Sequence, residues 1–111
     1  MHKIAVSDIF GVTPAFNELC NQLKGETVIV DPYCGEQLEF TSENAAYSFF
    51  MENVGLEKYV NILETKIALI PAPFTIIGFS VGGSAIWKLA ANPPDTKIVI
   101  PSFRRQRILF Q

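Results

Sequence analysis

The sequence alternates short runs of β-branched residues with segments of helical periodicity, and this alternation constrains the fold more than any other feature. The predicted strands are Lys3–Val6, Thr27–Val30, Phe74–Gly78 and Lys97–Ile100. Strands that are apolar along their whole length are typical of a parallel sheet that is buried on both faces. We therefore predict a single α/β domain over residues 1–111, a mostly parallel four-stranded sheet with helices on both faces.

Helical segments connect these strands. Thr13 followed by Pro14, and later Ser42, are residues that favour the start of a helix, whereas Gly25 and Gly55 favour its end. The spacing predicts helices from 14 to about 24, from 43 to 54, from 56 to 67, and after residue 80 as far as the prolines at 93 and 94. Right-handed crossovers then favour a doubly wound sheet with strand order 2-1-3-4.

Ligands bind doubly wound sheets where neighbouring strands send their helices to opposite faces, beyond the carboxyl ends of the strands. In the order 2-1-3-4 this point lies between strands 1 and 3. Strand 1 ends in the sequence "SDIFG" at Ser7–Gly11, and strand 3 ends in "GFSVG" at Gly78–Gly82. We expect any functional site to lie between these two segments.

The segment "GFSVG" passes from strand to helix without a spacer and places Ser80 at the turn. Such a turn is sharp enough to strain the backbone, and it needs small residues two places on either side of the serine. Gly78 and Gly82 occupy those places. The geometry would present the Ser80 hydroxyl at the positive N-terminal end of the following helix.

Two backbone N–H groups could stabilise an oxyanion at this turn: that of Val81 and one from the loop after strand 1, at Ile9 or Phe10. Two other interpretations remain open. The segment could be a tight strand-to-helix turn without chemistry, or a loop that cradles phosphate at a helix N-terminus. Against phosphate, the glycine spacing is G-x-x-x-G-G instead of G-x-G-x-x-G, and it follows the third strand.

The segments "DIFGVTPAFNELCNQL", "VIVDPY" and "IIGFSVGG" resemble, in this order and at similar spacing, the dienelactone hydrolase family of the α/β-hydrolase fold. The resemblance covers about Lys3–Ile100. It implies hydrolysis of small esters or lactones of carboxylic acids without a cofactor. The site residues that it implies are Ser80 as nucleophile, Asp8 as the acidic residue beside it, Ile9 and Val81 as oxyanion N–H donors, and Phe10 and Tyr33 at the border of the site.

The sequence departs from this family where the catalytic Asp and His should follow strand 4. The one histidine, His2, precedes strand 1 at the opposite end of the sheet, about 20 Å from Ser80 at ~3.3 Å per strand residue. Asp95 begins a strand instead of ending one. We therefore expect a truncated or frame-shifted hydrolase with little or no activity alone, whose exposed sheet edge drives self-association.

Asp8 has two possible roles. It could act on Ser80 as a base, although a carboxylate with an ordinary pKa is a poor base for a hydroxyl unless burial raises that pKa. It could instead tie its loop together by accepting hydrogen bonds from neighbouring N–H groups.

Composition limits the function classes. Hydrophobic residues make up 49% of the 111 residues and charged residues 18%, with a net charge of −2, which favours a globular domain and disfavours nucleic-acid binding. No apolar run is long enough for a membrane span, so a cytoplasmic location is expected. Cys20 fits a buried helical face and Cys34 an exposed loop, and neither has the neighbours of a metal site.

Three functions are compatible with these observations. The first is a hydrolase fragment with a formed nucleophile turn and little turnover. The second is a small active esterase whose base comes from Asp8 or from another subunit. The third is a binding or interaction module, or a nucleotide-binding half-domain, that uses the same sheet without catalysis.

Overall fold

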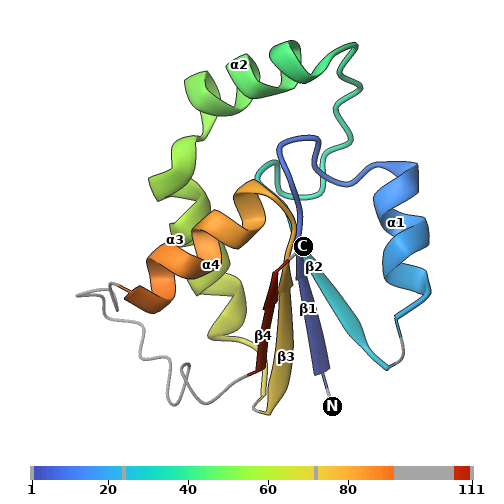
Figure 1. The fold of residues 1–111 in the computed structure, drawn as a ribbon, viewed down its shortest axis with the longest axis vertical. Coiled ribbons are helices and arrows are strands. Elements are labelled where there is room, and N and C mark those ends of the chain that lie inside the picture. Colours follow the sequence, from blue (N-terminus) through green and yellow to red (C-terminus); the bar gives the residue numbers. More distant parts are fainter. Residues whose placement is uncertain (1, 24, 72, 92–106, 111) are drawn as a thin grey trace.

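The structure, a computed structural model, describes residues 2–23, 25–71, 73–91 and 107–110. Its centre is a parallel sheet in which β1 lies between β2 and β3 (Figure 1). These strands are β1 (His2–Val6), β2 (Thr27–Val30) and β3 (Phe74–Gly78). Val6 at the end of β1 is level with Val30 on one side and Gly78 on the other. The α/β class and the parallel pairing of the first three predicted strands are therefore confirmed.

The fourth strand differs from the prediction. The predicted strand Lys97–Ile100 lies outside the described residues, as does Asp95. The strand that pairs with β3 is instead β4 (Arg107–Phe110), which gives the order β2-β1-β3-β4. The predicted four-stranded sheet, with its fourth strand at 97–100, is not confirmed.

Four helices join these strands within the described ranges: α1 (Pro14–Asn21), α2 (Glu43–Asn53), α3 (Gly55–Ile67) and α4 (Val81–Ala91). The predicted caps are present, because the side chains of Thr13 and Ser42 each accept a hydrogen bond from a backbone N–H of the first turn. α1 ends three residues before the predicted Lys24. The N–H groups of the two residues that follow it, Gln22 and Leu23, bond to carbonyls three residues back, and this tighter turn ends the helix.

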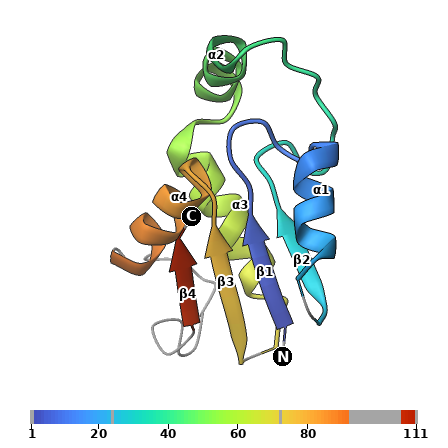
Figure 2. The ribbon, with the colours of Figure 1, turned by 45° about the vertical axis from the view of Figure 1, so that its right-hand side comes forward.

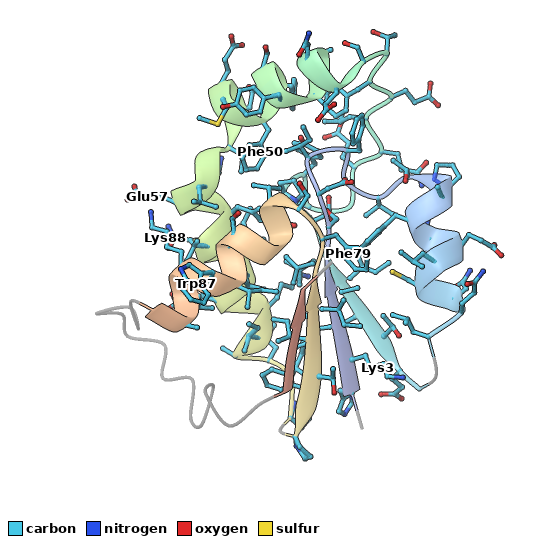
Figure 3. The ribbon with its side chains drawn as sticks, viewed as in Figure 1. Lys3, Phe50, Glu57, Phe79, Trp87 and Lys88 are labelled. Carbon is cyan, nitrogen blue, oxygen red and sulfur yellow. The ribbon has the colours of Figure 1, made fainter. Side chains whose placement is uncertain are left out.

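Helices lie on both faces of the sheet (Figure 2). α1 covers one face, where Phe16 and the buried Cys20 pack with Ala5 of β1. α3 and α4 cover the other face, and Leu63 of α3 and Ile86 of α4 belong to one core cluster there. On the outer side of this pair, Lys88 Nζ lies 3.7 Å from Glu57 Oε1, next to the exposed Trp87 (Figure 3).

α2 lies beyond the carboxyl ends of the strands and joins α3 through Val54 (Figure 1). Gly55 has a φ of 77°, a conformation that glycine adopts easily and that redirects the chain between the two helices. Phe50 anchors α2 by packing edge-on against Tyr59 of α3, with ring centroids 5.9 Å apart. Among the described residues, no helix combines the length and the hydropathy that a membrane span requires.

We predict that Leu63→Ala destabilises the domain strongly, whereas Leu69→Ala does not. Leu63 is fully buried between α3 and the sheet, so the substitution should cost about 2–5 kcal/mol of unfolding free energy. Leu69 is 77% exposed, and its loss should stay within about 0.5 kcal/mol. Urea denaturation of both variants tests this, and equal effects would contradict the packing described here.

Candidate active site

Ser80 lies at the sharp turn between β3 and α4, and its backbone is strained there. Its φ is 55°, in the left-handed region that non-glycine residues seldom adopt. Phe79 O accepts a hydrogen bond from Gly82 N at 2.9 Å, which closes the turn. Ser80 is exposed, although it follows a fully buried strand.

The two residues that flank Ser80 are anchored on opposite faces of the sheet. Phe79 (labelled in Figure 3) packs edge-on against Phe16 of α1, with ring centroids 5.3 Å apart. Val81 packs against the core cluster under α3 and α4. Because both neighbours are held inward in opposite directions, the serine between them is left at the surface.

Both glycines of the turn are in contact with backbone, so a side chain would not fit at either position. A Cβ on Gly78 would lie 2.6 Å from Gly83 Cα, at the start of α4. A Cβ on Gly82 would lie 2.2 Å from the carbonyl oxygen of Val6 and 2.7 Å from that of Ser7. The first turn of α4 therefore rests directly on the end of β1.

This contact brings the loop after β1 next to the serine turn. Val6 and Gly78 are partners in the β1–β3 pairing, and Val6 O accepts a hydrogen bond from Phe79 N at 3.0 Å. The side chain of Ile9 packs against the same core cluster as that of Val81. The structure thus brings together the segments that carry the two predicted oxyanion donors.

Three consecutive carbonyl groups in this loop accept hydrogen bonds, and so the loop is fixed. Ser7 O accepts from the Tyr59 hydroxyl at 2.7 Å. Asp8 O accepts from the Ser7 hydroxyl at 3.1 Å and from Gly11 N at 3.2 Å. Ile9 O accepts from the Tyr33 hydroxyl. Tyr59 and Tyr33 come from α3 and from the loop after β2. Burial, with the nearby carboxylates of Asp8 and Asp31, raises the pKa of Tyr33 to about 12. Burial also raises the pKa of Tyr59, so both phenols remain donors.

Asp8 ties the loop together. Its Oδ1 accepts a hydrogen bond from Phe10 N at 2.9 Å, and burial raises the pKa of its carboxyl above the usual value. The N–H of Phe10 is therefore occupied, which leaves Ile9 as the loop donor. The N–H of Ile9 has no hydrogen bond within the described part of the chain, and no hydrogen bond there joins Asp8 to Ser80.

Tyr33 lies beside the loop, and Phe10 belongs to the loop; both rings are part of an aromatic cluster with Phe40 and Phe49. Ring centroids are 5.8 Å apart for Tyr33 and Phe40, and 6.5 Å apart for Phe10 and Phe40. The Tyr33 hydroxyl donates to the loop, and the ring fills the space beside Gly11. Tyr33 therefore supports the loop, in addition to its predicted place at the border of the site.

Asp31 also holds a turn. Its two carboxylate oxygens accept hydrogen bonds from the N–H groups of Tyr33 and Gly35, at 3.0 and 2.9 Å. Like Asp8, it follows a strand at the carboxyl edge of the sheet. Both carboxylates therefore shape loops at this edge.

His2 is at the other end of the sheet, as predicted. It is the first residue of β1, where it pairs with Phe74, and its Nδ1 lies 3.2 Å from Glu26 Oε2. It belongs to the strand, whereas the prediction placed it before the strand. Among the residues that the structure describes, no group of three His, Cys, Asp or Glu side chains could hold a metal ion.

Two residues of this edge were missed by the sequence reasoning. Tyr59 appeared only as one apolar position of a helix, and Ser7 only as the start of a turn. A tyrosine on a buried helical face is itself a signal, because its hydroxyl needs a hydrogen-bond partner there. The sequence does not show which carbonyl that partner is.

Comparisons with known proteins do not assign the chain to a family: no family model matches it, and no curated protein or solved structure is significantly similar to it. The resemblance to dienelactone hydrolases therefore rests on the three segments quoted above.

We predict that Gly82→Ala destabilises the domain by about 1–3 kcal/mol, because the new methyl group would collide with the carbonyl oxygens of Val6 and Ser7. Ser84→Ala is the matched control, since Ser84 is exposed on the same helix and should change stability by less than about 0.5 kcal/mol. Urea denaturation measures both. Equal stabilities would mean that α4 can move away from β1 at little cost.

We predict that Asp8→Asn removes part of the pH dependence of stability. The folded-state pKa of Asp8 is raised, so its contribution is fully present below the unfolded pKa and is lost as pH rises through the folded pKa. The wild type should therefore lose stability relative to Asp8→Asn as pH rises from about 3 to about 7. Asparagine keeps an oxygen that can accept from Phe10 N. Urea denaturation at several pH values gives the unfolding free energy of both proteins. A difference between the wild type and Asp8→Asn that stays constant from pH ~3 to ~7 would contradict the prediction.

Proposed function

We propose that this chain is a serine hydrolase of the dienelactone hydrolase type, which acts on small carboxylic esters or lactones with Ser80 as the nucleophile. The observation that carries the proposal is the φ of 55° at Ser80, in a strand-to-helix turn closed by Gly78 and Gly82. Strained backbone is retained where the surrounding structure enforces it, and it occurs preferentially at functional sites. The same turn leaves Ser80 exposed, so a substrate can reach it.

The proposed reaction uses the backbone around Ser80. Ser80 Oγ attacks the carbonyl carbon of the ester, a C–O bond forms, and the carbonyl electron pair moves to the oxygen. This oxyanion would accept hydrogen bonds from the N–H groups of Ile9 and Val81. Its collapse breaks the bond to the alkoxide, which takes up the serine proton through water. In a lactone the alkoxide stays attached to the acyl group. Water then hydrolyses the acyl-serine.

Proton transfer limits this reaction. A serine hydroxyl is a weak nucleophile unless an adjacent base activates it. His2 lies at the far end of β1, and Asp8 Oδ1 is engaged with Phe10 N. The raised pKa of Asp8 makes it a stronger base than an ordinary aspartate, but it has no hydrogen bond to Ser80 among those of the described residues. We therefore propose that the chain alone acylates slowly and turns over little.

We predict that a fluorophosphonate labels Ser80 with one adduct per chain. Ser80 Oγ would form the O–P bond, fluoride would leave, and the serine proton would pass to buffer. Intact-mass analysis should show the adduct in the wild type and its loss in Ser80→Ala. Ser84→Ala is the matched serine control, because Ser84 is exposed one turn further along α4 and should not affect labelling.

The result that would overturn the proposal is an unlabelled wild type, or equal labelling of the wild type and Ser80→Ala. The first result would favour the alternatives of a non-catalytic binding module or a nucleotide-binding half-domain. If Ser80 is labelled, hydrolysis of a simple activated ester shows whether turnover is slow or fast. Slow deacylation would give a burst of about one equivalent of product per chain before the steady state.

A further inference from the structure

The Asp8–Ile9 peptide is fixed on its carbonyl side. Asp8 O accepts hydrogen bonds from the Ser7 hydroxyl at 3.1 Å and from Gly11 N at 3.2 Å. In a trans peptide the C=O and the N–H point in opposite directions. The N–H of Ile9 must therefore point away from Ser7 and Gly11, on the other side of the peptide plane.

Ser7 is itself held in place. It is fully buried, so water cannot replace its partners. Its Oγ lies 3.4 Å from the hydroxyl of Tyr59, which is a packing contact, because the Ser7 proton is donated to Asp8 O. The same Tyr59 hydroxyl donates to Ser7 O at 2.7 Å and lies 3.2 Å from Val30 O. A phenol has one proton, and the shorter of these two distances places it on Ser7. Tyr59 of α3 thereby holds Ser7, and Ser7 holds the peptide that carries the Ile9 N–H.

We propose that Ser7 is a positioning residue, whose hydroxyl orients the Asp8–Ile9 peptide so that the Ile9 N–H is directed at the oxyanion formed on attack by Ser80. This inference rests on the proposed function. Donors that are already oriented stabilise developing charge without a reorganisation cost, whereas a peptide that can rotate loses this advantage. Ser7 would thus act on the reaction without touching the substrate.

Ser7→Ala removes the hydroxyl and leaves Asp8 O with the Gly11 N–H alone. We expect the rate of fluorophosphonate labelling to fall at least tenfold, because losing one oxyanion donor outright typically costs about 10²–10³ in rate. Leu63→Ala is the control for stability. It removes buried packing without removing a hydrogen bond to the loop, so below its unfolding temperature it should be labelled at the wild-type rate.

A reaction that forms no oxyanion distinguishes positioning from general damage to the turn. Ser80→Cys, made together with Cys34→Ser, places an accessible thiol at the turn, since Cys34 is exposed and Cys20 is buried. Iodoacetamide alkylates this thiol by displacing iodide from a saturated carbon. Adding Ser7→Ala should leave the alkylation rate unchanged. The residual dipolar coupling of the Ile9 N–H, measured by NMR, should change in Ser7→Ala, because the coupling reports the direction of that bond.

Each outcome decides something. Slower labelling of Ser7→Ala with unchanged alkylation and an altered Ile9 coupling supports the inference. Wild-type labelling of Ser7→Ala, an equal loss in alkylation, a matching loss in Leu63→Ala, or an unchanged Ile9 coupling overturns it. If the wild type is not labelled at all, the proposed function fails, and the Ile9 coupling alone still decides whether Ser7 orients the peptide.

Discussion

The structure depends on one close approach, between the first turn of α4 and the carboxyl end of β1. A Cβ on Gly82 would lie 2.2 Å from Val6 O, which is closer than any side chain can come to a carbonyl oxygen. Val6 O also accepts the N–H of Phe79 at 3.0 Å, so a single carbonyl fixes both the end of β3 and the start of α4. With both sides of the turn held, Ser80 has no relaxed alternative, and its left-handed conformation follows from packing around it.

A second constraint joins the rest of the domain to this edge. Tyr59 belongs to α3, yet its hydroxyl contacts the carbonyl of Ser7, just after β1, and that of Val30, the last residue of β2. Its ring packs against Phe50 of α2. Burial raises the pKa of Tyr59, and the pKa of Tyr33 is about 12, so neither phenol loses its proton near neutral pH. The hydrogen bonds that these two phenols donate to the loop are therefore insensitive to pH near neutrality. Asp8, half-buried with a raised pKa, is the group of the loop whose charge does respond.

The parts that could be predicted from the sequence are those with a local cause. Thr27–Val30 and Phe74–Gly78 were predicted at their observed bounds, because each is a run of apolar or β-branched residues ended by a turn. The strained turn at Ser80 followed from its flanking glycines. The end of α1 was misplaced because the periodicity of side chains does not show where hydrogen bonds to the fourth residue back give way to hydrogen bonds to the third residue back.

The parts that could not be predicted depend on distant contacts. The bond from Tyr59 to Ser7 spans 52 positions, so no window of the sequence contains both partners. Asp8 remained ambiguous for the same kind of reason, since whether its carboxylate meets Phe10 N or Ser80 depends on the path of the loop. The strand β4 at Arg107–Phe110, which pairs with β3, was not predicted, because Ile108 is its one β-branched residue and Arg107 begins it, whereas the equally short Thr27–Val30 is β-branched throughout.

The two halves of the proposed site differ in what they require of the fold. The oxyanion donors are backbone N–H groups, and the β1–β3 pairing with the Gly82 contact is enough to bring their segments together. Proton transfer requires a side chain at Ser80, and the nearest carboxylate of the loop, Asp8, is directed to Phe10 N. Serine proteases that lack their triad residues still exceed the uncatalysed reaction by about 10³–10⁴ through the oxyanion site and binding. A turn of this kind without a histidine is therefore expected to be weakly active, and the orientation of the Ile9 N–H, which the loop fixes, would set how much of that residual rate it retains.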